Sequence, residues 1–288
     1  MKPFGDALTL AKNSRGCYIL DTVKGCSIVN TRSGGCYGDC YAVNIAKRYR
    51  LDFGSPVLRR ILDDRHRASL VRQMTKAPVE FIRIGEMGDP SEDWEHTLSI
   101  APLIREAGKA CVIITKHWKP IPDTILPCMH GITVNTSVSA LDSHGELEYR
   151  LAQHERLKAH CNPVLRIVSC RFNLDNIDGR ERHTTQERLL SMGGIDTVFR
   201  PSPNNPFLVS GVIKAKTVQF LESKMLASIQ DPEAYRGRCE TCPDLCGLRS
   251  GDSRTKPPKP ALSVFPHSWN YRPPSSNVSP LDFDSLFD

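Results

Sequence analysis

Three cysteines, Cys26, Cys36 and Cys40, stand in one glycine-punctuated stretch and are the residues of this chain best suited to chemistry. They lie between an apolar run that ends near Leu20 and a basic, helix-like segment over residues 42–50. A loop of this kind can bring three thiolates to one point and leave a fourth coordination position open. The spacing therefore predicts an iron–sulfur centre that binds a small molecule directly.

A structural zinc site is the alternative, because zinc also binds cysteines at short spacings. Such a site needs four protein ligands, and no fourth Cys or His lies within the loop itself. His66 is separated from the loop by a predicted helix, so a closed site would need a remote partner. The pattern favours iron and sulfur over zinc.

The loop resembles the radical SAM superfamily, in which three cysteines hold a [4Fe-4S] cluster and S-adenosylmethionine chelates the remaining iron. Cys36 and Cys40 reproduce the first gap of the usual Cys-x3-Cys-x2-Cys motif, but Val43 stands where the third cysteine would follow. Cys26 replaces it upstream, giving Cys-x9-Cys-x3-Cys. The Gly-Cys, Gly-Cys and Cys-Tyr-Ala sequences are similar to a phage-associated branch with a stretched cysteine motif. The resemblance covers residues 15–250 in pattern and is specific in the cysteine loop.

Length and composition are those of a protein with one main domain. With 288 residues, 40% of them apolar, the chain can bury one substantial core. Its eleven cysteines are an odd number, so metal binding explains them better than a disulfide framework. No run of about 18 apolar residues and no secretory leader is visible, which predicts a cytoplasmic protein that does not span a membrane.

Short apolar runs alternate with amphipathic stretches, which predicts parallel strands joined by helices. Six strands are expected, over residues 17–21, 79–84, 110–115, 131–136, 164–169 and 197–200. Helices are expected over residues 42–50, 57–75, 94–107, 146–159, 185–191 and 216–229. The series predicts an α/β fold, a partial (βα)6 barrel of the TIM type, which the radical SAM resemblance also implies. A doubly wound open sheet is the alternative.

Composition divides the chain into three expected regions. Residues 1–235 would form the partial barrel, and residues 236–250 a cysteine-rich metal-binding segment. Residues 251–288 are rich in Pro and Ser and cannot form a packed core, which predicts an extended or disordered tail.

A second group of cysteines, Cys239, Cys242 and Cys246, again places three thiolates in one turn-rich loop. It favours an auxiliary iron–sulfur cluster, a second [4Fe-4S] cluster, over a zinc site. The fourth ligand is open between Cys170, Cys17 and a substrate.

Polar residues follow the predicted strands, where ligands gather in parallel α/β folds. Gly85 and Glu86 follow the second strand, at the position of a Gly-Gly-Glu motif that contacts the amino group of the cofactor in radical SAM proteins. Ile84 stands at the first glycine position of that motif. An adjacent carboxylate can accept hydrogen bonds from an ammonium. Alternatively, Glu86 and Asp89 cap the next helix.

The same resemblance implies that polar groups on the fourth and fifth strands hold the ribose and carboxylate of S-adenosylmethionine. Asn135, Ser137 and Arg166 are the residues in those positions. Arg166 lies within an apolar strand, where a charge is costly unless it is paired. It either reaches a ligand carboxylate or forms an internal salt bridge.

The sequence thus predicts a radical SAM enzyme that cleaves S-adenosylmethionine and starts hydrogen abstraction, supplied with electrons by a reducing partner such as flavodoxin or ferredoxin. Basic residues at 47–50, 59–60 and 65–72, with the phage resemblance, favour a nucleobase or modified nucleotide in DNA or RNA as substrate, for modification, isomerisation or repair. Two alternatives are a zinc-dependent nucleic-acid-binding module without catalysis and an iron–sulfur electron carrier.

Overall fold

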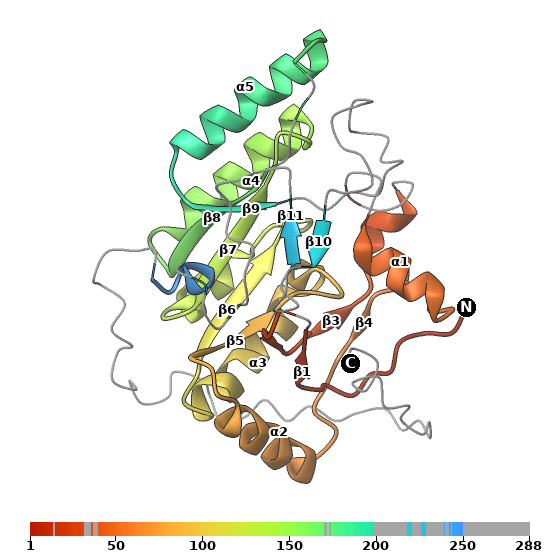
Figure 1. The fold of residues 1–288 in the computed structure, drawn as a ribbon. Helices are drawn as coiled ribbons and strands as arrows, with labels where there is room; N and C mark the ends of the chain where they lie inside the picture. Colours follow the sequence, from red (N-terminus) through yellow and green to blue (C-terminus); the bar gives the residue numbers. More distant parts are fainter. Residues whose placement is uncertain are drawn as a thin grey trace.

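A seven-stranded sheet forms the centre of the computed structural model (Figure 1). The described residues are 1–13, 15–31, 36, 40–169, 172, 174–198, 218–220, 226–228, 239, 242 and 244–249. The strands of the sheet span Ala11–Lys12 (β1), Tyr18–Ile19 (β2), Phe81–Ile84 (β5), Ala110–Thr115 (β6), Thr133–Val138 (β7), Asn162–Ser169 (β8) and Ile195–Val198 (β9). β1 pairs with β2 in the antiparallel sense, and all other neighbours pair in parallel.

The parallel strands lie side by side in the order in which the chain makes them, β2-β5-β6-β7-β8-β9. Each overlaps one of the six expected strands, so the α/β class with a mostly parallel sheet is confirmed. A doubly wound sheet reverses its strand order at a switch point, and this order does not reverse. It is compatible with a partial barrel. The last strand begins two residues before the expected position 197, and residues 199–200 lie outside the described part.

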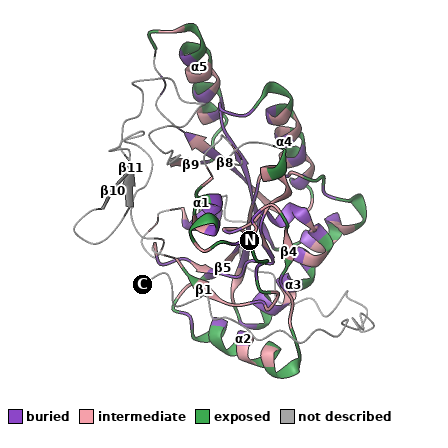
Figure 2. Ribbon diagram, turned by 90° about the vertical axis from the view of Figure 1, so that its right-hand side faces the viewer, coloured by how far each residue is buried: buried purple, intermediate pink, exposed green. Residues whose placement is uncertain are grey.

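Helices cover one face of this sheet. These are Asp64–Lys76 (α2), Trp94–Glu106 (α3), His144–Leu157 (α4) and Ile177–Ser191 (α5), whereas Tyr41–Arg48 (α1) packs apart from the sheet with Phe4, Phe53 and Met87. Figure 2 shows buried residues on the strands and on the inner sides of α3 and α4, with exposed residues on the outer sides. Alternate strand residues such as Ile82, Ile113 and Val134 share one hydrophobic cluster with Leu70 of α2 and Ile104 of α3. Each buried side chain of this size stabilises the fold by about 1.5–3 kcal/mol.

The opposite face of the sheet, called here the inner face, is more polar. Side chains alternate along a strand, and directly paired residues of neighbouring strands share a face. In the parallel pairing of β6 with β7, Ile114 lies opposite Asn135. In the pairing of β7 with β8, Ser137 lies opposite Arg166. The inner face therefore carries Phe81, Arg83, Val112, Ile114, Asn135, Ser137, Val164 and Arg166. Three of the sequence-predicted cofactor residues thus lie on one surface.

The prediction of a helix over residues 57–75 was wrong for the first part of that range. Val57–Leu58 is a strand, β4, which pairs with β3 at Val23–Lys24. The helix α2 begins only after Asp63, whose side chain accepts a hydrogen bond from the main chain of His66. Apolar residues at helical spacing continue upstream of this cap, but Leu58 is 39% exposed, so they form no common buried face.

The prediction of a helix over residues 216–229 was also wrong for the residues of this range that the structure describes. Val218–Phe220 (β10) and Leu226–Ser228 (β11) pair as antiparallel strands. The alternation of Val, Gln and Phe in β10 has the period of a strand rather than a helix. The expected helix over residues 185–191 is the last part of α5, which begins eight residues earlier at Ile177.

None of the helices in the described residues combines the length and the apolar character needed to cross a bilayer. The expected tail, residues 251–288, lies outside the described part of the chain, as does Cys170. Residues 236–250 are described at positions 239, 242 and 244–249 only.

Candidate metal and cofactor site

The N-terminal cysteine loop, named for Cys26, Cys36 and Cys40, is fastened to the turn that follows β5. The amide of Gly25 donates to the carbonyl of Met87 at 2.9 Å, and Gly25 forms an isolated bridge with Gly88. A Cβ added at Gly88 would collide with the carbonyl oxygens of Val23 and Gly25. Only glycine allows this close approach, which places Cys26 at the carboxyl end of β5.

Residues after Cys26 are held by a buried carboxylate. Glu92 Oε1 accepts hydrogen bonds from both the amide and the hydroxyl of Ser27, each at 2.7 Å. Glu92 ends the short 3-10 helix η3 (Pro90–Glu92), and its Oε2 lies 3.5 Å from Nζ of Lys119. The loop therefore begins from a fixed main chain. α1, which follows Cys40, packs beside the β3–β4 ladder (Figure 1).

The three thiols of the N-terminal cysteine loop are neighbours. The Cys40 thiol donates a hydrogen bond to Cys36, which lowers the pKa of Cys36 to about 6, helped by the charges of Lys116 and Arg150. The same hydrogen bond and burial raise the pKa of Cys40. Burial raises the pKa of Cys26, and the charges of Asp89, Glu92 and Cys36 add to the effect. Cys36 therefore favours the thiolate form more than Cys26 and Cys40 do, and metal binding at this loop would release protons.

A buried charge network lies beside Cys36, and sequence reasoning missed most of it. Arg150 of α4 is 1% exposed, forms an ion pair with Asp142, and donates from Nε to the carbonyl of Lys116 at 2.8 Å. Nζ of Lys116 lies 3.7 Å from Oδ1 of Asp142. The Arg150 guanidinium also stacks on Trp118, 4.4 Å from the ring centroid. An arginine within an amphipathic helix is usually exposed, so sequence alone gave no signal for its burial.

Gly85 and Glu86, which follow β5, lie beside the N-terminal cysteine loop. Gly85 has a φ of +99°, and the carbonyl of Glu86 accepts a hydrogen bond from the hydroxyl of Tyr41 at 2.6 Å. The Glu86 carboxylate is held by Arg83 and by Asn13, whose Nδ2 lies 3.1 Å from Oε2. It is thus a charge-compensated carboxylate at the edge of the inner face.

The alternative role of Asp89 as a helix cap is confirmed. Its Oδ1 accepts hydrogen bonds from the amide of Ser91 at 2.9 Å and the hydroxyl of Thr115 at 2.6 Å. Its Oδ2 accepts from the amide of Lys116 at 2.8 Å. Asp89 therefore caps η3 and also ties the carboxyl end of β5 to that of β6, while Glu86 serves different partners.

The C-terminal cysteine group, Cys239, Cys242 and Cys246, lies against the inner face near the start of β2. The neighbouring Cys17 side chain lowers the pKa of Cys239 to about 6, and the charges of Arg15, Arg83 and Arg166 act in the same direction. The Cys17 thiol itself donates to the carbonyl of Tyr18 at 3.8 Å. The Cys246 thiol lies close enough to Cys239 and Cys242 for the sulfurs to interact electrostatically. The structure thus brings together the three predicted cysteines and Cys17.

Asn135 and Arg166 are closer to the C-terminal cysteine group than the sequence indicated. Asn135 is fully buried and donates from Nδ2 to the carbonyl of Cys246 at 2.9 Å, while its Oδ1 has no hydrogen-bond partner among the described residues. Arg166 donates to the hydroxyl of Thr197 at 3.2 Å and interacts with the Cys246 thiol. Ser137, also buried, is the register partner of Arg166.

The predicted basic segments divide into buried and exposed parts. Arg59 is 6% exposed and bonds to Thr9 and to the carbonyl of Ala7, so it holds the N-terminal segment in place. Arg60 pairs with Asp6, and Arg67 with Glu106. The exposed basic residues include Lys47 and Arg48 of α1 and the following Arg50, together with Arg65 and Arg72 of α2.

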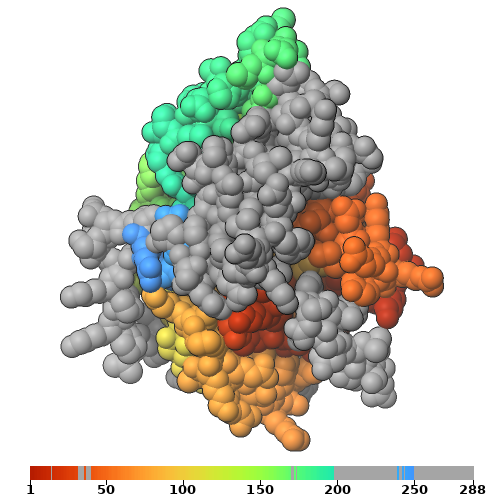
Figure 3. Space-filling view, in the orientation of Figure 1, coloured from red at the N-terminus to blue at the C-terminus, as the bar shows by residue number. Residues whose placement is uncertain are grey.

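In the described part of the chain, no three His, Cys, Asp or Glu side chains are arranged closely enough to hold a single metal ion as they stand. Both cysteine groups are therefore sets of neighbouring thiols rather than preformed coordination spheres. In Figure 3 the C-terminal segment (blue) and α1 (orange) both reach the surface on the face in view, on opposite sides of it.

The sequence matches no family model, and no curated protein is significantly similar to it.

Proposed function

We propose that the chain is a radical SAM enzyme whose Cys26, Cys36 and Cys40 hold a [4Fe-4S] cluster. The main support is that the main chain beside Cys26 is fastened to the carboxyl end of β5, where ligands of parallel α/β folds bind, and that Cys36 interacts with both Cys40 and Cys26. In enzymes of this class the cluster reduces and cleaves bound S-adenosylmethionine, and the adenosyl radical abstracts hydrogen from a substrate. The sheet would then form a partial (βα)6 barrel around the cofactor.

The residues around the loop suit an anionic cluster. Lys116 and Arg150 place positive charge beside Cys36, which favours its thiolate form and would offset the charge of a thiolate-bound cluster. Tyr41, the first residue of α1, fixes the helix to the carbonyl of Glu86. The loop is therefore held both at Gly25 and at Tyr41, so its cysteines start from a defined position.

The inner face offers groups that could orient S-adenosylmethionine. The buried Oδ1 of Asn135, which has no hydrogen-bond partner among the described residues, is an acceptor for a ligand N–H or O–H. Ser137 and Arg166 stand beside it in register. Glu86 could accept from the cofactor ammonium alongside its bonds to Arg83 and Asn13, because a carboxylate accepts about four hydrogen bonds.

Anaerobic purification followed by electron paramagnetic resonance with and without S-adenosylmethionine tests this assignment. We expect iron and sulfide, a spectrum that changes when the cofactor is added, and formation of 5′-deoxyadenosine with dithionite or with flavodoxin or ferredoxin as reductant. The Cys36→Ala variant should lose the cofactor-dependent change and 5′-deoxyadenosine. The matched control is Cys111→Ala, a buried cysteine on the helix-covered face. Zinc in place of iron and sulfide would contradict the assignment and favour a metal-binding module without catalysis.

For the substrate, we infer a nucleobase or modified nucleotide in a nucleic acid, in a cytoplasmic setting. Lys47, Arg48 and Arg50 are exposed on and just after the helix that follows Cys40, where they could hold phosphates flanking a base in the site. Binding of single- and double-stranded oligonucleotides should weaken with salt. Replacing the three residues by Ala should reduce the slope of log K against log salt by about 0.9 for each phosphate that is no longer neutralised. Arg72→Ala, at an exposed position of α2, is the control. Binding independent of salt would count against this substrate class.

A further inference from the structure

We propose that Cys17, Cys239, Cys242 and Cys246, which are not a preformed coordination sphere in the metal-free protein, converge on metal binding into a second, closed centre with four thiolate ligands, which holds either a zinc ion or an iron–sulfur cluster. This centre is separate from the N-terminal cysteine loop and does not depend on the radical chemistry inferred above. Four cysteine ligands are the usual complement both of structural zinc and of cubane clusters, and they leave no position open for a substrate.

The cysteines come from distant parts of the chain and meet on the inner face. Cys17 immediately precedes β2, its thiol donates to the carbonyl of Tyr18 at 3.8 Å, and Cys239 packs against the buried cluster that contains Cys17. The amide of Cys239 donates to the carbonyl of Arg15 at 2.8 Å, and the amide of Cys242 to the carbonyl of Cys239 at 3.3 Å. Cys17 and Cys246 belong to the same buried cluster, whose other buried members are Ile19, Phe81, Val112 and Leu245. Main-chain bonds and packing therefore place Cys17 beside the C-terminal group.

Positive charge surrounds these sulfurs. Four thiolates with a divalent ion, or with an oxidised cubane cluster, carry a net charge of about −2, which is costly to bury unless it is compensated. Arg15, Arg83 and Arg166 all interact electrostatically with Cys239. Arg83 also acts on Cys17 and Cys246, and Arg166 on Cys246. Arginines that face sulfur ligands are the compensation that a four-thiolate centre requires.

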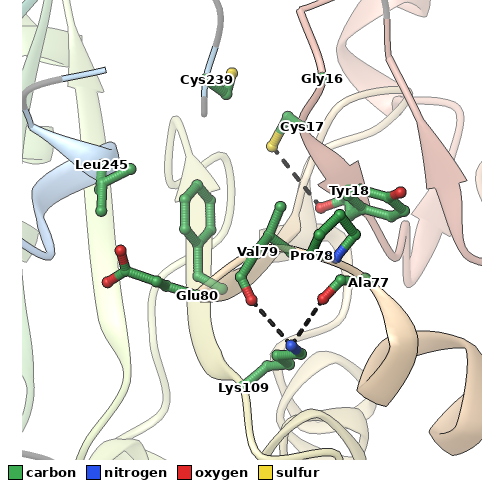
Figure 4. Close-up of a pocket in the computed structure, with 11 residues that line it drawn as sticks. Gly16, Cys17, Tyr18, Ala77, Pro78, Val79, Glu80, Lys109, Cys239 and Leu245 are labelled. Carbon is green, nitrogen blue, oxygen red and sulfur yellow. Dashed lines mark hydrogen bonds between the residues drawn. The ribbon is translucent and has the colours of Figure 1, made fainter. Parts of the chain in front are cut away.

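A cavity of about 400 Å³ opens beside Cys17 and Cys239 at the amino ends of β2, β5 and β6. Figure 4 shows the two cysteines at one end of it and Lys109 at the other, where Nζ donates to the carbonyls of Ala77 and Val79 at 2.8 and 3.0 Å. The N-terminal cysteine loop stands at the carboxyl ends of the same strands. The two sites therefore lie toward opposite ends of β5.

Other cysteines do not share this environment. Cys111 is buried in the hydrophobic cluster on the helix-covered face, and Cys128 and Cys161 pack against that cluster. Cys161 donates from Sγ to the carbonyl of Leu157 at 3.6 Å, in the pattern of a small helix-end residue. It is the control for Cys17, because it is a partly buried cysteine on the other side of the sheet.

The test removes the N-terminal site first. In the full-length chain with Cys26, Cys36 and Cys40 all replaced by Ala, we expect retention of about one zinc or about four iron atoms per chain. Visible absorbance from charge transfer distinguishes the cluster from zinc. Adding Cys17→Ser should weaken metal retention against a chelator by about tenfold or more, whereas adding Cys161→Ser should leave it unchanged.

X-ray absorption at the metal edge gives a second measurement, made on wild-type protein if the triple variant does not fold. A zinc-loaded centre should show four sulfur neighbours at about 2.3 Å. Three results would contradict the second metal centre. They are loss of all metal from a folded triple variant, full metal retention after Cys17→Ser is added, and a Cys17–Cys239 disulfide in freshly isolated protein. None of these results bears on 5′-deoxyadenosine formation by the wild type, so the two assignments fail separately.

Discussion

The side-chain amide of Asn135 donates a hydrogen bond of 2.9 Å to the main-chain carbonyl of Cys246, although the two residues are 111 positions apart in the chain. Asn135 lies on β7, in the middle of the sheet, and Cys246 lies in the short 3-10 helix η6 (Leu245–Gly247). Asn162 makes a similar contact, 3.3 Å to the carbonyl of Gly247. Two asparagines of neighbouring strands thus fasten the C-terminal cysteine group to the inner face.

Replacing Asn135 by Ala should loosen this segment. The Cys246 carbonyl would lose its buried donor, which costs about 1–3 kcal/mol of unfolding free energy. We expect faster alkylation of Cys246 in the metal-free protein, measured by peptide mass spectrometry. Ser137→Ala, two residues along the same strand and face, is the control. Equal alkylation rates in the two variants would show that the hydrogen bond does not hold the segment.

The buried ion pair between Arg150 and Asp142 should matter more for stability than a surface pair. Arg150→Leu removes the guanidinium that faces the fully buried Asp142 carboxylate, and we expect the free energy of unfolding in urea to fall by about 3 kcal/mol or more. Arg182→Leu, which breaks the partly exposed pair with Asp178 on α5, should cost about 1 kcal/mol or less. Similar losses in both variants would contradict the buried network.

Gly88→Ala tests the close approach that positions Cys26. A Cβ at this site meets the carbonyl oxygen of Gly25 at 2.7 Å, so the loop must shift, at a cost of about 1–3 kcal/mol. Reconstituted protein should bind less iron at the N-terminal loop and show a weaker cofactor-dependent resonance signal. Gly145→Ala in α4 has open space around the new methyl group and should instead stabilise the protein by about 0.5–1 kcal/mol. An unchanged signal in Gly88→Ala would be evidence against this positioning role.

His117 should make the stability depend on pH. Burial lowers its pKa from the usual 6.5 to about 3, with help from the charge of Arg150. Between these two values the unfolded chain binds a proton that the folded chain does not, so stability rises with pH across this window. Its contribution is fully present above pH 6.5 and is lost at up to about 1.4 kcal/mol per pH unit as the pH falls toward 3.

Urea unfolding at pH 7 and pH 5 measures this effect. In His117→Gln the pH dependence should be shallower than in the wild type, because Gln does not titrate and can still bond to Thr136, which lies 2.9 Å from the His117 ring. His144→Gln, at an exposed position of α4, should keep the wild-type slope. The same slope in all three proteins would exclude His117 as the source.

Much of the parallel sheet could be predicted from the sequence because β5 and β6 are short apolar runs with polar residues after them. Phe81–Ile84 and Ala110–Thr115 are largely buried on both faces, and such runs are recognisable without knowledge of their partners. The start of α2 could not be predicted from spacing alone. Val57–Leu58 forms a strand because β3 lies beside it, which is a contact between distant parts of the chain.

The same reason limits prediction of the site. Cys26, Cys36 and Cys40 were recognisable because they are local in sequence, and so was the cap at Asp89. The proximity of Cys17 to the C-terminal cysteine group depends on where that segment docks, which local sequence does not encode. The burial of Arg150 could not be predicted from the sequence, because it depends on the ion pair with Asp142 and the stacking on Trp118 in the folded protein.

The docking of η6 on β7 also has a consequence for how the protein is made. The segment that covers Phe81 and Val112 on the inner face is synthesised after every strand of the sheet. Until then the nascent protein presents an apolar surface with arginines and thiols to its surroundings. Translation arrested before Cys239 would leave that surface uncovered, a product that chaperones should retain and proteases should remove.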